Sequence, residues 1–82
     1  MSRYVYRQAI LDALLVHGVR PTEHTPPGLV RDFVRDLYKY EIRSLRERYL
    51  RREFPRKEYA GRVVELRDRY PVLARIAREW VE

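Results

Sequence analysis

Residues 27–53, PGLVRDFVRDLYKYEIRSLRERYLRRE, decide the fold. After the opening Pro-Gly pair the stretch has no helix-breaking residue, and its apolar side chains recur at helical spacing. An α-helix of this length measures about 40 Å, because each residue advances the axis by about 1.5 Å. In a chain of 82 residues, one neighbour of ordinary size cannot cover such a helix. We therefore predict an all-α fold, a small bundle of three to four helices around one long central helix over about 27–53.

The apolar positions of this central helix shift around its axis by about a quarter turn along its length. They begin as Val30, Phe33, Val34 and Leu37 and continue as Tyr38, Ile42, Leu45 and Tyr49. A moving apolar face predicts two different neighbours. One half of the helix should pack on the preceding helix, and the other half on the C-terminal helices or on another subunit.

Proline and glycine divide the rest of this single helical domain, residues 1–82, into segments. Ser2 is a candidate N-cap, Gly18 supplies a left-handed stop, and Thr25 is a candidate cap for the central helix. The predicted segments are a helix over 3–17, a proline-rich connector over 18–27, the central helix, a helical hairpin over 56–70 and a C-terminal helix over 71–82.

The first predicted helix is apolar on nearly all sides. Ile10 and Leu14 lie on one face, while Leu11 and Leu15 emerge on the opposite face. A helix with this pattern is either enclosed on several sides or lies at a subunit contact. So small a protein has little material with which to enclose it, which favours self-association as a two-fold dimer.

The C-terminal third contains three further indicators of packing. Phe54 and Tyr59 have the spacing of a hydrophobic staple around a turn, and Gly61 would permit a close helix crossing. Trp80 either locks the last turn to the core or fills a pocket on a partner, and core locking is the favoured interpretation.

Residues 45–66, LRERYLRREFPRKEYAGRVVEL, resemble the short C-terminal helical hairpin known as SHOCT. The likeness rests on Phe54, Glu58, Tyr59 and Leu66, which occupy the aromatic, acidic and leucine positions of that pattern. Arg52 and Pro55 stand where the pattern has glycine and Ser or Thr. The resemblance implies an oligomerisation or anchoring element and covers about a quarter of the chain.

Composition argues against several classes of function. The chain has no cysteine, glycine-rich phosphate loop or HExxH pair, and the spacing of its few hydroxyl residues indicates no catalytic triad. We therefore expect no enzyme activity, metal or cofactor. The longest apolar run, residues 13–16, is far too short to cross a bilayer and no leader pattern opens the chain, so we expect a cytoplasmic protein without a membrane segment.

The amino-acid usage has two explanations that the sequence leaves open. Arginine outnumbers lysine sixteen to two, asparagine is absent and glutamine occurs once. Many ion-pairing side chains and few thermolabile ones are typical of heat-adapted proteins. A GC-rich genome would produce the same arginine bias.

Glu41, Ser44 and Arg48 form a candidate polar row, because they lie on the line extended from Val30 and Val34. The functional interpretation places them in a cleft, helped by His17 or a tyrosine. The structural interpretation places them at the edge of the buried face, where Glu41 pairs with an arginine and Arg48 covers apolar surface with its stem. An unpaired buried carboxylate would be costly, and the structural interpretation is favoured.

Positive charge is concentrated in residues 39–57, where eight basic and three acidic side chains give +5 of the whole chain's +6. The candidate basic patch consists of Arg35, Lys39, Arg43, Arg46, Arg51, Arg52, Arg56 and Lys57. A phosphate backbone could lie along these residues. Interspersed acids at helical ion-pair spacing would also make a solvated helix face.

These patterns lead to one expectation and one alternative. The expected function is a non-catalytic, self-associating interaction or scaffolding module, held together through the first helix or the exposed half of the central helix. The alternative is a nucleic-acid-binding protein that uses the basic segment 39–57.

Overall fold

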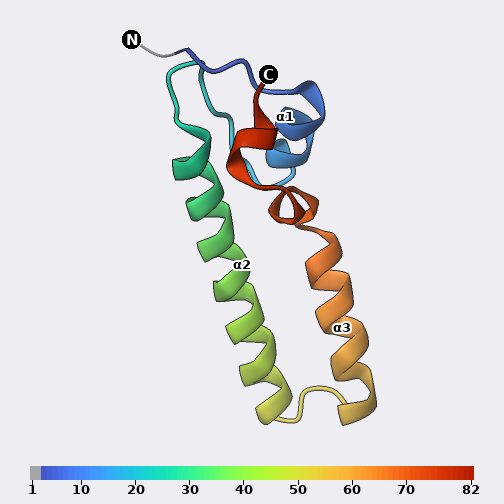
Figure 1. Ribbon diagram of the computed structural model, residues 1–82. Coiled ribbons are helices and arrows are strands. Elements are labelled where there is room, and N and C mark those ends of the chain that lie inside the picture. Colours follow the sequence, from blue (N-terminus) through green and yellow to red (C-terminus); the bar gives the residue numbers. More distant parts are fainter. Residues whose placement is uncertain (1–2) are drawn as a thin grey trace.

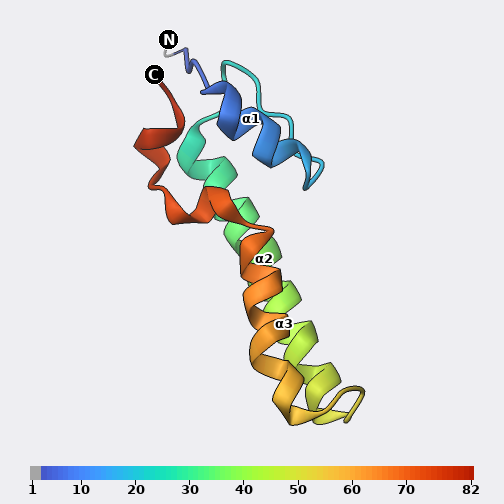
Figure 2. The same ribbon diagram turned by 90° about the vertical axis from the view of Figure 1, so that its right-hand side faces the viewer.

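The computed structural model describes residues 3–82, and these form an all-α bundle with one long central helix, as predicted (Figure 1). The elements are α1 (Gln8–Leu15), α2 (Pro27–Leu50), α3 (Arg56–Asp68) and the 3-10 helices η1 (Pro71–Ala74) and η2 (Ala77–Trp80). The bundle is elongated, with extents of 51 × 19 × 17 Å. Helix α2 runs along most of its length. Helix α3 covers one half of α2, and α1 with the C-terminal segment covers the other (Figures 1 and 2).

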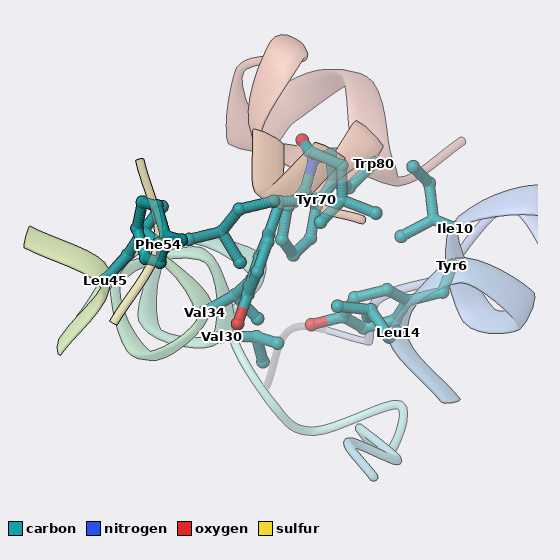
Figure 3. Close-up of a cluster of buried hydrophobic side chains, with 11 residues drawn as sticks. Tyr6, Ile10, Leu14, Val30, Val34, Leu45, Phe54, Tyr70 and Trp80 are labelled. Carbon is teal, nitrogen blue, oxygen red and sulfur yellow. The ribbon is translucent and has the colours of Figure 1, made fainter. Parts of the chain in front are cut away.

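The best-packed part of the core lies at the end where α1, α2 and the C-terminal segment meet. The largest fully buried side chains are Leu14 of α1, Val34 of α2, Val72 of η1 and Trp80 of η2. Figure 3 shows Leu14, Val34 and Trp80 directed toward a common centre. Trp80 therefore locks the C-terminal segment to the core, as the favoured interpretation expected.

The first helix is shorter than the predicted span of 3–17. It begins at Gln8, because the residues before it pair with distant parts of the chain: the Tyr4 N–H donates to the Glu23 carbonyl (2.7 Å) and the Arg7 N–H to the Trp80 carbonyl (2.9 Å). Tyr6 likewise forms an isolated antiparallel bridge with Val81. The proposed Ser2 cap lies outside the described residues.

The predicted glycine stop after the first helix is confirmed. Gly18 has φ 73°, and its N–H donates to the Leu15 carbonyl (2.9 Å) while the Val19 N–H donates to the Leu14 carbonyl (3.1 Å). These two bonds form a Schellman motif, which satisfies carbonyls that have no partner within the helix.

The central helix starts at the predicted residue but without the expected cap. Pro26 occupies the N-cap position, and the Thr25 hydroxyl instead accepts the Thr22 N–H (3.0 Å) inside the connector. The Thr25 carbonyl accepts the Tyr6 hydroxyl (2.6 Å), which ties the connector to the N-terminal segment.

The central helix ends at Leu50, three residues before the predicted limit of 53. Arg52 has φ 60°, its N–H donates to the Tyr49 carbonyl (2.9 Å), and the Glu53 N–H donates to the Arg48 carbonyl (3.1 Å). This is a second Schellman motif with arginine in the position that favours glycine. The chain then turns through Pro55 into α3.

The hairpin packs through aromatic rings and not through Gly61. The predicted staple is confirmed, with the rings of Phe54 and Tyr59 stacked at 6.4 Å between centroids and Tyr49 at 4.7 Å from Tyr59. Gly61 is exposed, and an added Cβ would meet nothing within 4 Å. The close crossing predicted at Gly61 is therefore wrong, because Gly61 lies on an exposed side of α3.

The predicted single helix over 71–82 is also wrong. The segment consists of two 3-10 turns separated by extended backbone at Arg75 and Ile76. Side chains occupy carbonyls that a continuous α-helix would use: Arg31 of α2 donates to the carbonyls of Leu73 (2.9 Å) and Arg75 (2.8 Å). The Trp80 indole N–H donates to the Val72 carbonyl (3.2 Å).

Candidate functional site

The polar row lines a cleft between α2 and α3. Glu41, Ser44 and Arg48 are half-buried on α2, and they face Arg62 and Glu65 of α3 and the following Arg69 across a volume of about 250 Å³. The cleft of the functional interpretation therefore exists. Arg48 also behaves as the structural interpretation expected, since its guanidinium lies 5.7 Å from the centre of the buried Phe54 ring and pairs with Glu53 (3.2 Å).

Glu41 is held by a tyrosine and not by the expected arginine. The Tyr70 hydroxyl donates a hydrogen bond to the Glu41 carboxylate, and the His17 ring stacks on Tyr70 with 4.2 Å between centroids and 17° between planes. His17 Nε2 is buried without a hydrogen-bond partner among the described residues. Three elements thus meet here: the end of α1, the middle of α2 and the end of α3.

The electrostatics of Tyr70 follow from this environment. Burial is the main reason that the pKa of Tyr70 lies well above its usual range, and the hydrogen bond to Glu41 and the negative charge of that carboxylate raise the pKa further. The phenol therefore stays protonated and serves as a fixed donor that holds α3 to α2.

The contribution of the Tyr70–Glu41 hydrogen bond to stability should be measurable at alkaline pH. A tyrosine with a pKa near 10 in the unfolded chain and a higher pKa in the folded protein contributes stability that is complete below pH 10 and is lost as the pH rises toward the folded value. We expect the free energy of unfolding to fall by at most about 1.4 kcal/mol per pH unit above about pH 10 from this group.

The measurement is urea unfolding between pH 9 and 11.5 for the wild-type protein and Tyr70→Phe. The variant should start less stable and then show a shallower alkaline loss, because it has no group at position 70 to ionise. Tyr6, whose pKa burial also raises, is present in both proteins and cancels in the comparison. Equal slopes for the two proteins would contradict the assignment.

Two residues of the candidate basic patch form ion pairs with acidic side chains, and the others do not. Arg35 lies 3.3 Å from Asp32 and 3.8 Å from Asp36, and Arg51 lies 3.0 Å from Glu53. No carboxylate within residues 3–82 forms an ion pair with the remaining six, all of them exposed: Lys39, Arg43, Arg46, Arg52, Arg56 and Lys57. Lys39, Arg43 and Arg46, here called the basic row, follow the outside of α2, and the other three lie at the hairpin turn.

Helix α2 carries an exposed apolar surface that the sequence patterns predicted only in part. Phe33, predicted in the buried face of α2, is 55% exposed, and Leu29 and Tyr40 are 64% and 69% exposed. Together with the half-buried Leu37 they form a line along α2 at helical spacing, here called the exposed stripe. Val16 at the end of α1 is 76% exposed and lines a hollow together with Leu37 and Tyr40.

Phe33 was wrongly predicted to be buried, because apolar character and spacing do not show how much of the helix surface its neighbours cover. The sequence likewise left open whether Leu15 is enclosed or lies at a subunit contact, and Leu15 is exposed in the single copy. Tyr70 carried no local signal as a partner of Glu41, because the two residues are 29 positions apart.

Two further properties concern ligands and membranes. Within residues 3–82, no three His, Asp or Glu side chains lie close enough together to hold a metal ion. Over the same residues, no helix has the length and apolar character that a bilayer crossing requires.

The chain is thus a small all-α bundle with a long central helix, which carries a polar cleft, an exposed stripe and a basic row. No protein-family model, curated protein or solved structure matches it. The likeness of residues 45–66 to SHOCT remains a resemblance. Arg52, which stands where that pattern has glycine, has the positive φ that glycine favours.

Proposed function

We propose that this protein is a non-catalytic interaction module that binds a second copy of itself through the exposed stripe. The observation that carries the proposal is the exposure of Leu29, Phe33 and Tyr40 in one line on α2, beside Val16 at the C-cap of α1. Burying apolar surface contributes about 25 cal/mol per Å², and contiguous apolar patches mark interaction sites more often than scattered residues do.

A second copy fits this surface because an apolar stripe is complementary to itself, as a two-fold contact requires. In an antiparallel contact centred near residue 35, Leu29 of each copy faces Tyr40 of the other, and Phe33 faces Leu37. A parallel contact would instead place Glu47 against Glu47 and align the two helix dipoles. Like charges and parallel helix dipoles disfavour that arrangement.

Two other features agree with the proposal. The resemblance of residues 45–66 to SHOCT implies an oligomerisation element. A chain of 82 residues buries only roughly 60% of the surface that its unfolded form exposes, less than a larger domain does, so a partner copy adds stability that its own core cannot supply.

Sedimentation equilibrium tests the proposal with Phe33→Gln, which removes an exposed apolar side chain and keeps both charge and helix propensity. Each dimer loses the contact twice, so about 2–3 kcal/mol is removed and the dissociation constant should rise on the order of 100-fold. Val64→Gln is the matched control, because Val64 is an exposed apolar residue on α3 outside the stripe. A strictly monomeric wild-type protein, or equal weakening by both variants, would contradict the proposal.

Nucleic-acid binding is the second candidate, and the unpaired basic row favours it. Arginine and lysine without acidic partners are free to neutralise phosphates and release counterions. If a single copy binds through the three charges of this row, the logarithm of its affinity for duplex DNA should fall with the logarithm of salt concentration with a slope near −2.7.

A further inference from the structure

Helix α2 presents three different sides, and their order around the helix axis determines where the basic rows lie in the dimer. At about 100° per residue, the exposed stripe is centred about 110° from the basic row on one side. The buried residues Val30, Val34 and Leu45 are centred about 100° from the stripe on its other side. The stripe therefore separates the body of the protein from its basic row.

Two-fold symmetry then places both basic rows on the same face of the dimer. In an antiparallel pair the two-fold axis is perpendicular to the helices and to the line that joins them. A rotation about that axis exchanges the copies but leaves each feature on the side of the helix pair where it started. The two bodies thus lie on one side of the α2 pair, and the two basic rows lie together on the other.

We propose that self-association creates a composite basic face that binds duplex DNA, an inference that rests on the proposed function. The face contains Lys39, Arg43 and Arg46 of each copy, six cations in all. With the contact centred near residue 35, Arg46 lies 11 residues from the two-fold axis in each copy. The two rows therefore span about 33 Å, at about 1.5 Å per residue. One turn of B-form DNA is about 34 Å long.

The local chemistry of the face suits phosphate. Guanidinium groups bind phosphate oxygens in a bidentate manner, and two of the three charges in each row are arginines. The one acid between residues 39 and 46 is Glu41, which lines the polar cleft and accepts the Tyr70 hydroxyl. No other carboxylate lies between the three cations, and the nearest ones along α2 are Asp36 and Glu47 at the two ends of the row.

The separation of the two basic rows limits the repulsion between their like charges. The rows begin at Lys39, about 6 Å along the helix from the two-fold axis in each copy, so their repulsion is moderate at physiological salt. A bound polyanion would remove that repulsion. By linkage, DNA should strengthen the dimer by the same factor by which dimer formation strengthens DNA binding.

The test measures fluorescence anisotropy of a labelled DNA duplex of about 16 base pairs against salt concentration, with sedimentation of the same samples. The wild-type dimer should show a log–log slope near −5.4, as expected for six phosphate contacts. Phe33→Gln, which keeps every charge, should bind as a monomer with a slope near −2.7 and at least tenfold lower affinity. Arg43→Ala should reduce the wild-type slope by about 1.8, because each substitution removes two contacts from the dimer.

Arg20→Ala is the control for net charge, since Arg20 is an exposed arginine of the connector and lies outside the row. It should leave the slope unchanged. A wild-type dimer that retains no duplex at low salt, or one that binds anionic phospholipid vesicles but not DNA, would overturn the inference and leave self-association standing. A monomeric wild-type protein with a slope near −2.7 would overturn both.

Discussion

Replacing Trp80 with alanine should remove a large part of the stability of the protein. Trp80 is fully buried, and truncation of a buried tryptophan costs about 3–5 kcal/mol. A domain of this size has a total stability of only about 4–12 kcal/mol, from about 0.05–0.15 kcal/mol per residue. The loss should also release the C-terminal segment, because the substitution removes both the buried ring and the indole N–H that holds the Val72 carbonyl.

Urea unfolding followed by far-UV circular dichroism measures this effect, since the substitution removes the only tryptophan available for fluorescence. Trp80→Phe should cost less, about 1–2 kcal/mol, because it keeps most of the ring and loses the hydrogen bond. Ile76→Ala is the matched control, as Ile76 is an apolar residue of the same segment that is 47% exposed. If Trp80→Ala were no more damaging than Ile76→Ala, the tryptophan would not anchor the segment.

Local patterns were sufficient to predict the parts of the fold that local interactions determine. The long apolar periodicity predicted α2, and Gly18 and the pair Phe54 and Tyr59 predicted a helix stop and a staple, all three of which are found. The end of α2 was misplaced by three residues because Arg52 adopts a positive φ, which arginine adopts only rarely. No residue type at that point indicated the turn.

Long-range pairing explains the larger errors. Residues 3–7 were predicted as helix, but the C-terminal segment pairs with them, through the Tyr6–Val81 bridge and the bond from Arg7 to Trp80. A partner more than 70 positions away leaves no periodic trace in either segment. Glu41 is a similar case, because its polar row was recognised from spacing while its partner Tyr70 was not.

The second large effect is expected at Arg31, which binds the segment that was wrongly predicted as a helix over 71–82. This side chain was not singled out by any sequence pattern, yet its guanidinium donates to two backbone carbonyls of the C-terminal segment, at 2.8 and 2.9 Å. Arg31→Met keeps the apolar stem and removes both donors. Hydrogen bonds to charged groups contribute about 1.5–3 kcal/mol each when buried, and one of these two is exposed, so we expect a loss of about 2–3 kcal/mol.

A loss of that size should lower the melting temperature by about 10–20 °C, because one kcal/mol corresponds to about 4–8 °C in domains of this size. Arg31→Lys should recover only part of it, since an ammonium lacks the planar fork that reaches two carbonyls. Arg35→Met one turn later is the matched control, because Arg35 makes only exposed ion pairs with Asp32 and Asp36 and should cost less than about 1 kcal/mol. Equal melting temperatures for Arg31→Met and Arg35→Met would show that Arg31 does not anchor the C-terminal segment. The expected difference instead adds the guanidinium at the edge of the segment to the indole in the core as a second side-chain anchor.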